Sequence, residues 1–207
     1  MKRTVTFGEI MLRLKTPEHM RILQTDAFEA SYGGAEANVA VSLAVLKDPV
    51  SFVTKLPENP VGTAALNEVR RYGADTSKVV IGGSRLGIYF FEKGTDIRPT
   101  NVVYDREGSA LALAKPEEFH WDEILKDTDI FYFSGVTPAV SENIAKAVLE
   151  ALKYCKAHGI ETVCDLNYRS KMWDTKKAQS VMSELMNYVT LCIANDEDFE
   201  SSLGIHA

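Results

Sequence analysis

Residues 31–46, Ser-Tyr-Gly-Gly-Ala-Glu-Ala-Asn-Val-Ala-Val-Ser-Leu-Ala-Val-Leu, decide the fold of this chain. The segment that leads into them, Phe28 to Tyr32, alternates aromatic and polar residues as an extended strand does. Gly33 and Gly34 permit a tight turn and a close approach of other groups to the backbone. Larger apolar residues then follow at helical spacing, at Val39, Leu43 and Leu46. The pattern therefore predicts a strand, a glycine turn and a helix rich in small residues.

The N-terminus of this predicted helix is a candidate binding site. Unpaired backbone N–H groups at a helix N-terminus can meet a polar ligand. Asn38 falls in the first turn, where a poor helix former suggests that its side chain has a polar partner. The segment alone leaves two interpretations open: a binding site, or a tight turn in which Asn38 bonds only to backbone.

The composition is that of a globular protein without a nucleic-acid or membrane partner. Of the 207 residues, 45% are hydrophobic, which provides a core for one domain with at most a small appendage. The net charge is −6, and we find no Lys/Arg cluster, no apolar run of membrane-spanning length and no secretory signal. Cys155, Cys164 and Cys192 lack metal-ligand spacing, so we expect reduced thiols and a cytoplasmic protein.

The rest of the chain alternates between strand and helix patterns. We expect strands at residues 4–9, 50–55, 79–81, 129–134, 160–165 and 189–194, and helices at 35–46, 59–73, 121–126, 141–158, 174–188 and 195–203. Such alternation predicts an α/β fold with a parallel, doubly wound sheet that has helices on both faces. Ligands of such sheets bind beyond the carboxyl ends of the strands.

A segment with a different sequence pattern interrupts the alternation of strands and helices. Residues 86–92 and 101–105 read as paired strands on either side of a polar loop, and Arg21 to Thr25 and Phe28 to Tyr32 read as two further short strands. We expect these strands to form a small β appendage.

Three groups of polar residues are candidates for chemistry. Asp165, Asn167 and Arg169 alternate after a predicted strand, and arginine can hold a carboxylate or a phosphate with two bonds. An ordinary surface loop would explain the same residues. Asn195 and the acids up to Asp198 open the last helix, where they suit the helix dipole or a water-bridged Mg²⁺.

The third group lies on the appendage. Tyr89, Tyr104 and Arg106 combine two hydroxyls with a guanidinium, which suits a hydroxylated, anionic ligand. An edge hairpin with packed aromatic residues is the alternative. The sequence has no GxxxxGK[ST], GxGxxG, HExxH or GxSxG motif, and its four histidines have no metal-ligand spacing.

Taken together, these positions resemble the ribokinase-like (PfkB) family of carbohydrate kinases, and within it the bacterial 2-keto-3-deoxygluconate kinases. The motifs that carry the resemblance are Gly8-Glu9, Gly33 to Asn38, Gly87 to Tyr89, Tyr104 to Arg106, Asp165 to Arg169 and Asn195 to Asp198. The match runs through the chain in order, and it is more specific for the family than for the sugar.

The resemblance implies a single ribokinase-like domain over residues 1–207. This domain is a three-layer α/β/α sandwich with a small β-sheet lid formed by residues of about 20–32 and 86–105, which also joins two subunits into a homodimer. It implies substrate contacts at Gly33, Gly34, Asn38, Tyr89, Tyr104, Arg106 and Arg169. It implies ATP contacts at Asn167, Arg169 and Asn195, and a role for Asp198 in placing Mg²⁺. In the family motif N-x-x-E this acid is Glu, so Asp198 is one methylene shorter.

The implied reaction is transfer of the γ-phosphoryl group of ATP to a hydroxyl of 2-keto-3-deoxygluconate or a similar sugar acid. Arg106 and Arg169 favour a substrate with a carboxylate over a neutral sugar. Two alternatives stay open: another kinase of this family, acting on fructose, ribose or a nucleoside, and a non-catalytic sugar-binding fragment.

The family's anion-hole motif, Gly-Ala-Gly-Asp, does not occur before Ala207. The chain thus resembles the N-terminal portion of such a kinase. We expect the catalytic aspartate to lie beyond Ala207, with no catalytic base in these residues, and the 207-residue chain to be inactive alone.

Overall fold

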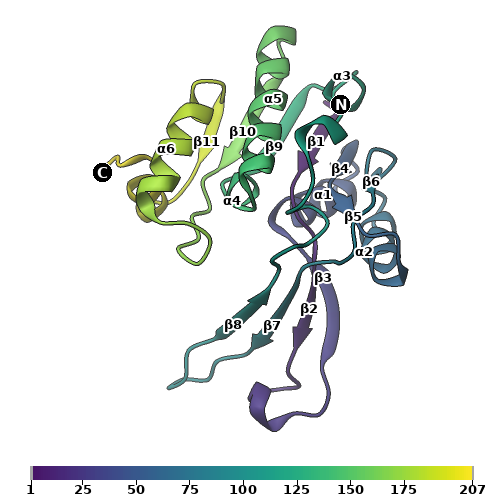
Figure 1. The fold of residues 1–207 in the computed structure, drawn as a ribbon, viewed down its shortest axis with the longest axis vertical. Helices are drawn as coiled ribbons and strands as arrows, with labels where there is room; N and C mark the ends of the chain where they lie inside the picture. The colour runs from purple at the N-terminus through teal and green to yellow at the C-terminus, as the bar shows by residue number, and fades with distance from the viewer. Residues whose placement is uncertain (1, 207) are drawn as a thin grey trace.

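The main sheet of the protein is parallel throughout and has five strands (Figure 1). The structure, a computed structural model, describes residues 2–206. The strand order is β11-β10-β9-β1-β4, formed by β1 (Thr4–Phe7), β4 (Val50–Val53), β9 (Ile130–Ser134), β10 (Glu161–Asp165) and β11 (Leu191–Ile193). All residues of β1 and β4 are buried, as expected for strands covered on both faces.

Helices cover both faces of this sheet. The two faces are lined by different apolar clusters, because Phe52 and its neighbour Val53 on β4 point to opposite sides. One cluster holds α1 (Ala35–Val45) and α2 (Pro60–Arg70), and the other holds α3 (Trp121–Ile124), α5 (Glu142–His158) and α6 (Thr175–Met186). Two short helices, α4 (Val136–Ala139) and α7 (Asp196–Leu203), follow β9 and β11. The predicted three-layer α/β/α architecture is confirmed.

Helix α1 packs on the sheet through alanines. Ala37, Ala40 and Ala44 are buried, whereas Leu46 is 71% exposed. The face expected from Val39, Leu43 and Leu46 is therefore wrong in detail. Small side chains let the helix backbone lie close to β1 and β4, so the larger residues are displaced to its flanks and end.

A second sheet projects from the main sheet (Figure 1). We call it the lid sheet. Its order is β3-β2-β7-β8, formed by β2 (Met11–Lys15), β3 (Glu29–Gly33), β7 (Ile88–Glu92) and β8 (Asn101–Asp105). Pairing of β2 with β7 is parallel and the other two pairings are antiparallel. The small β-sheet lid is confirmed, and strand β2 is an addition that the sequence analysis did not foresee.

The strand predicted at residues 21–25 is wrong, so only the end of the expected lid segment 20–32 is a strand. Ile22–Gln24 form a short 3₁₀ helix, closed by a bond of 2.9 Å from the Gln24 N–H to the Arg21 carbonyl. The Glu92 carboxylate accepts the Ile22 N–H at 3.1 Å and holds this turn. The apolar side chain of Leu23 suggested a strand, but it is 94% exposed and packs in no core.

The remaining elements are short connections. A two-residue parallel pair, β5 (Lys55–Leu56) with β6 (Val80–Ile81), and a 3₁₀ helix at Pro116–Glu118 complete the fold. Within residues 2–206, no helix combines the length and apolar character needed to cross a bilayer.

Candidate functional site

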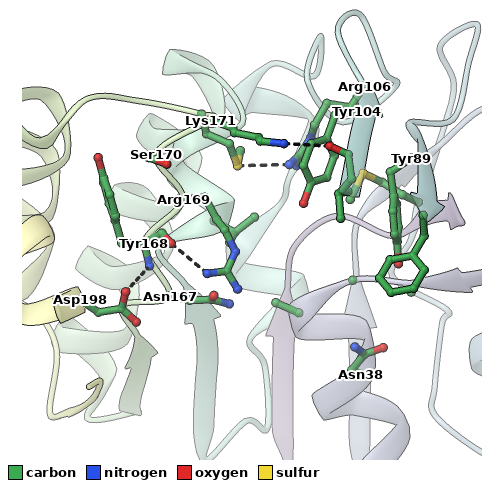
Figure 2. Close-up of a pocket in the computed structure, with 18 of the residues that line it drawn as sticks. Asn38, Tyr89, Tyr104, Arg106, Asn167, Tyr168, Arg169, Ser170, Lys171 and Asp198 are labelled. Carbon is green, nitrogen blue, oxygen red and sulfur yellow. Dashed lines mark hydrogen bonds between the residues drawn. The ribbon is translucent and has the colours of Figure 1, made fainter. Parts of the chain in front are cut away.

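One cavity brings together all ten residues to which the sequence analysis gave binding roles. It has a volume of about 940 Å³ and lies between the lid sheet and the carboxyl ends of the main-sheet strands. The ten residues are Gly33, Gly34, Asn38, Tyr89, Tyr104, Arg106, Asn167, Arg169, Asn195 and Asp198. Figure 2 shows how most of them face one another from the lid, the loop after β10 and helix α1.

The N-terminus of α1 forms the floor of this cavity. Gly34 is the N-cap residue, and a Cβ atom there would lie 1.8 Å from the backbone oxygen of Glu9, so only glycine fits. A Cβ atom on Gly33 would lie 3.6 Å from Asn38 Oδ1 and 3.9 Å from the Tyr89 hydroxyl. The amide of Asn38 and the Tyr89 hydroxyl thus converge on one point beside the glycine turn, and Asn38 points up from the helix (Figure 2).

Two tyrosines on neighbouring lid strands form one wall. Tyr89 of β7 and Tyr104 of β8 are direct partners across the strand pair, with ring centroids 5.9 Å apart. Burial raises the pKa of the Tyr89 hydroxyl above its usual value of 10.0, so this group is a hydrogen-bond donor at neutral pH. The wall presents hydroxyls and ring faces, which suit a polyhydroxylated ligand.

Arg106 at the end of β8 is already paired. Its guanidinium forms an ion pair with the Glu9 carboxylate, which is only 4% exposed. Ser109 Oγ donates to the same carboxylate at 2.6 Å, and Arg106 Nη1 lies 3.2 Å from the sulfur of Met172. The sequence analysis gave Arg106 a role in binding an anionic ligand and did not predict its ion pair with Glu9. The position of Gly8-Glu9 directly after the first strand was the available signal.

The loop after β10 forms the opposite wall. Asn167 has a positive φ of 38°, which turns the chain toward the cavity. Arg169 is exposed and donates to the backbone oxygen of Tyr168 at 2.9 Å. Lys171, which the sequence analysis missed, donates to the Val102 carbonyl at 2.8 Å and so links this loop to the lid sheet. Figure 2 shows that Arg169 and Lys171 come from the same loop.

Helix α7 closes the cavity on a third side. Asn195 is its N-cap, with its side-chain oxygen accepting the Asp198 N–H at 2.8 Å. Asp198 Oδ1 in turn accepts the Tyr168 N–H at 3.2 Å. Burial raises the pKa of nearby Asp165, and the charge of Asp198 adds to that shift. Residues 2–206 contain no cluster of three or more His, Cys, Asp or Glu suited to hold a metal directly.

A buried carboxyl group supports the floor from below. Glu36 of α1 is fully buried, and its Oε1 accepts hydrogen bonds from the Ser134 N–H at 2.9 Å and the Thr137 hydroxyl at 2.8 Å. Burial raises its pKa above the ordinary value of 4.5. A Cβ atom on Gly8 would lie 2.0 Å from Glu36 Oε2, which explains the glycine at the end of β1. The sequence analysis assigned no role to Glu36.

Comparisons with known proteins show what this chain is similar to. The model of the pfkB family of carbohydrate kinases matches residues 1–207. A 2-dehydro-3-deoxygalactonokinase of Haloferax volcanii is 38% identical over 201 residues, which cover 97% of this chain and 63% of that protein. A 5-dehydro-2-deoxygluconokinase of Shouchella clausii is 28% identical, over 98% of this chain and 63% of the relative.

Solved structures show the same relationship. A 2-dehydro-3-deoxygluconokinase from Thermotoga maritima superposes with a TM-score of 0.97 at 49% identity, covering all of this chain and 63% of that one. A PfkB family carbohydrate kinase from Listeria grayi superposes with a TM-score of 0.95 at 36% identity, covering all of this chain and 64% of that one. The chain therefore spans about 63% of the length of the curated relatives that it matches first.

Proposed function

The chain belongs to the pfkB family of carbohydrate kinases, and we propose that its cavity binds 2-keto-3-deoxygluconate or a similar 2-keto-3-deoxy sugar acid for phosphorylation by ATP. One observation carries the proposal. A single cavity combines tyrosine hydroxyls and an asparagine amide with several cationic side chains, and this mixture matches the hydroxyls and the carboxylate of a sugar acid. The names of the relatives from Haloferax volcanii and Thermotoga maritima point to the same substrate class.

In this proposal the α1 floor and the lid orient the sugar. The backbone N–H of Gly34 and the side-chain amide of Asn38 hold hydroxyls, and the hydroxyls of Tyr89 and Tyr104 bind further oxygens. Arg106 directs its remaining N–H donors at the substrate while Glu9 holds the guanidinium in place. Closure of the lid over the sugar would exclude water and so limit hydrolysis of ATP.

The loop after β10 and the start of α7 fit the phosphates of ATP. Asn167, Arg169 and Asn195 place amide and guanidinium groups at the carboxyl ends of β10 and β11, where such sheets bind ligands. Asp198 is the group that would place Mg²⁺, through water. ATP supplies the phosphoryl group and Mg²⁺ neutralises its charge during transfer.

Kinases of the same family that act on neutral sugars such as fructose or ribose, or on a nucleoside, are the second candidate. The Glu9–Arg106 pair favours them, because a neutralised guanidinium attracts a carboxylate less strongly. Arg169 and Lys171 also line the cavity, and neither forms an ion pair within residues 2–206, which favours the sugar acid.

The test is ADP release from Mg-ATP by the whole natural polypeptide. We expect turnover with 2-keto-3-deoxygluconate and none above background with fructose or ribose. Turnover with fructose or ribose at equal efficiency would overturn the sugar-acid proposal in favour of the second candidate. Binding of the sugar acid without ADP release under any condition would instead favour the third hypothesis, a non-catalytic sugar-binding protein.

We also propose a homodimer formed through the lid sheet, in the cytoplasm. The face of the lid sheet that points away from the cavity is apolar and partly exposed, formed by Leu12, Leu14, Ile88, Phe90 and Val103. Such a face favours burial against a second copy. The three cysteines are unpaired, as is usual in a reducing compartment.

A further inference from the structure

Arg13 on strand β2 is a cation in the cavity wall to which the sequence analysis gave no role. Its guanidinium lies over the ring of Phe91, with Cζ 4.2 Å from the ring centroid. The side chain is partly buried, and its Nε atom is buried without a hydrogen-bond partner. Within residues 2–206, no Asp or Glu forms an ion pair with it. Arg13 is thus a partly desolvated positive charge that lacks a counter-charge.

The other cations of the cavity are either paired with a carboxylate or exposed to solvent. Arg106 is neutralised by Glu9, as described above. Arg169 and Lys171 are exposed, and each donates to a backbone carbonyl. Removing a charge from water without a partner costs free energy, and a bound anion at Arg13 would recover it. Among these four cations, Arg13 therefore gains most from a negatively charged ligand.

The strand register places Arg13 beside the tyrosine wall. Arg13 pairs with Tyr89 across β2 and β7, and Tyr89 pairs with Tyr104 across β7 and β8, so all three side chains share one face of the lid sheet. The alternate residues Met11 and Phe91 on the same face also line the cavity. Burial raises the pKa of Tyr89, and the charge of Arg13 acts against this shift, as expected for close neighbours.

We propose that Arg13 receives the carboxylate of the sugar acid, and that Arg106 serves as a donor to neutral oxygens. The planar guanidinium can hold a carboxylate with two parallel hydrogen bonds, and the ring of Phe91, 4.2 Å from Cζ, supports the guanidinium from one side. Arg13 then determines the preference for an acid over a neutral sugar. This inference rests on the function proposed above, because it names the group that recognises the acid.

The experiment compares two ligands that differ only in the carboxylate. Calorimetric titration of the whole natural polypeptide with 2-keto-3-deoxygluconate is set beside titration with 3-deoxyfructose, in which a hydroxymethyl group replaces the carboxylate. We expect Arg13→Gln to weaken binding of the acid about 10- to 100-fold, the loss expected for a charged hydrogen bond. Binding of 3-deoxyfructose should change less than about threefold.

Two further variants separate this role from simpler ones. Lys15→Gln removes a positive charge from the same strand, outside the cavity, and should leave both affinities unchanged. Arg13→Lys keeps the charge but loses the fork, and should recover part of the affinity for the acid. It also serves as the test variant if Arg13→Gln lowers the melting temperature.

Distinct results would overturn the inference. Equal weakening of both ligands by Arg13→Gln would show that Arg13 only packs the lid. Unchanged affinity for the acid would assign the carboxylate to Arg169 or Lys171. If the wild-type protein binds neither ligand, or both equally, the proposed sugar-acid function itself fails and the inference fails with it.

Discussion

At the scale of the residue, the two glycines before α1 have different requirements: we expect Gly34 to matter for folding and Gly33 to matter for binding. Gly34→Ala would put a methyl group against the Glu9 carbonyl, whereas the position at Gly33 is open except for ordinary contacts. We expect Gly34→Ala to lower the free energy of unfolding by about 3 kcal/mol or more, and Gly33→Ala to change it by less than about 1 kcal/mol. Gly33→Ala should nevertheless weaken sugar binding, because its methyl group points between Asn38 and Tyr89.

Urea denaturation and a sugar titration of both variants check this expectation. The matched pair is informative because the two glycines are neighbours in one turn. A Gly34→Ala protein as stable as the wild type would mean that the turn can shift away from Glu9. Unchanged sugar affinity in Gly33→Ala would remove the glycine turn from the binding site.

The buried carboxyl of Glu36 should make stability depend on pH. The unfolded chain ionises this group near pH 4.5, whereas burial keeps it protonated to a higher pH in the folded protein. Its contribution to stability is therefore complete below pH 4.5 and declines as the pH rises toward the folded pKa. Glu36→Gln has no proton to lose, so its free energy of unfolding should vary less across this range.

Chemical denaturation from pH 4 to pH 8 measures this difference. As a contrast, Glu36→Leu removes the acceptor for Ser134 and Thr137 and should cost about 2–4 kcal/mol at every pH. Parallel pH curves for wild type and Glu36→Gln would mean that Glu36 titrates as it does in water.

At the scale of the element, Asn195 is the N-cap of α7 and, in the proposed function, also contacts ATP, and substitution can separate these two roles. As the N-cap of α7 it can be replaced by Asp, because both side chains accept the same backbone N–H. We expect Asn195→Ala to cost about 1 kcal/mol of stability and Asn195→Asp to cost little. Asn195→Asp should weaken Mg-ATP binding by the whole polypeptide, because a carboxylate repels phosphates. Unaltered nucleotide affinity in this stable variant would limit Asn195 to capping.

Helices were predictable because their ends are encoded locally. Asn59 caps α2 with Pro60 in its first turn, and α5 begins after Ser141 and ends at Gly159, which has a φ of 70°. Each of these signals acts within a few residues and needs no tertiary contact. The bounds of these two helices therefore lie within three residues of the expected ones.

The lid strands were less predictable because their pairing is not local. Strand β2 is stabilised by its pairing with β3 and β7. Residues Leu12 to Lys15 alternate between apolar and cationic side chains, a short strand pattern that the sequence analysis did not use. The reverse error arose at residues 21–25, where an apolar pair suggested a strand that a local turn replaces. Edge and lid strands depend on partners far away in sequence.

The candidate site, like the fold, contains residues that the sequence predicts and residues whose roles depend on distant partners. The ten residues that were given binding roles from the sequence all line the cavity, whereas Glu9 and Glu36 act through partners that only the fold reveals. Glu9 reaches Arg106 across 97 residues, and Glu36 reaches Ser134 across 98. A sequence pattern shows a carboxylate at each position but not which charge or donor it will meet.

At the scale of the whole molecule, the two faces of the lid sheet have different surroundings. One face lines the cavity, and the other carries the apolar set that includes Phe90 and Val103, the latter 47% exposed. We expect Val103→Lys to shift the protein from dimer toward monomer in sedimentation experiments, because a buried unpaired charge is unfavourable. Val45→Lys, at a 55% exposed site on α1 outside the lid, is the control. A monomeric wild type would refute the dimer.

The proposed kinase activity depends on where the general base of the whole molecule lies. Glu197 and Asp198 of α7 are the carboxylates that line the cavity, and Asp198 already accepts the Tyr168 N–H. We expect neither to serve as the base, since the family resemblance places that aspartate in a motif that residues 1–207 lack. Purified residues 1–207 should thus release no ADP above background with Mg-ATP and 2-keto-3-deoxygluconate. Loss of a general base alone lowers rates about 10²- to 10⁴-fold.

The comparison that decides this is between residues 1–207 and the whole natural polypeptide, each as wild type and as Glu197→Gln. If the base lies outside residues 1–207, only the whole polypeptide turns over, and Glu197→Gln retains most of that turnover. If residues 1–207 release ADP and Glu197→Gln abolishes it, Glu197 is the base and the assignment from resemblance is wrong. The second outcome would place the phosphoryl transfer at the α7 side of the cavity, and the sugar hydroxyl would then have to reach the N-terminus of that helix.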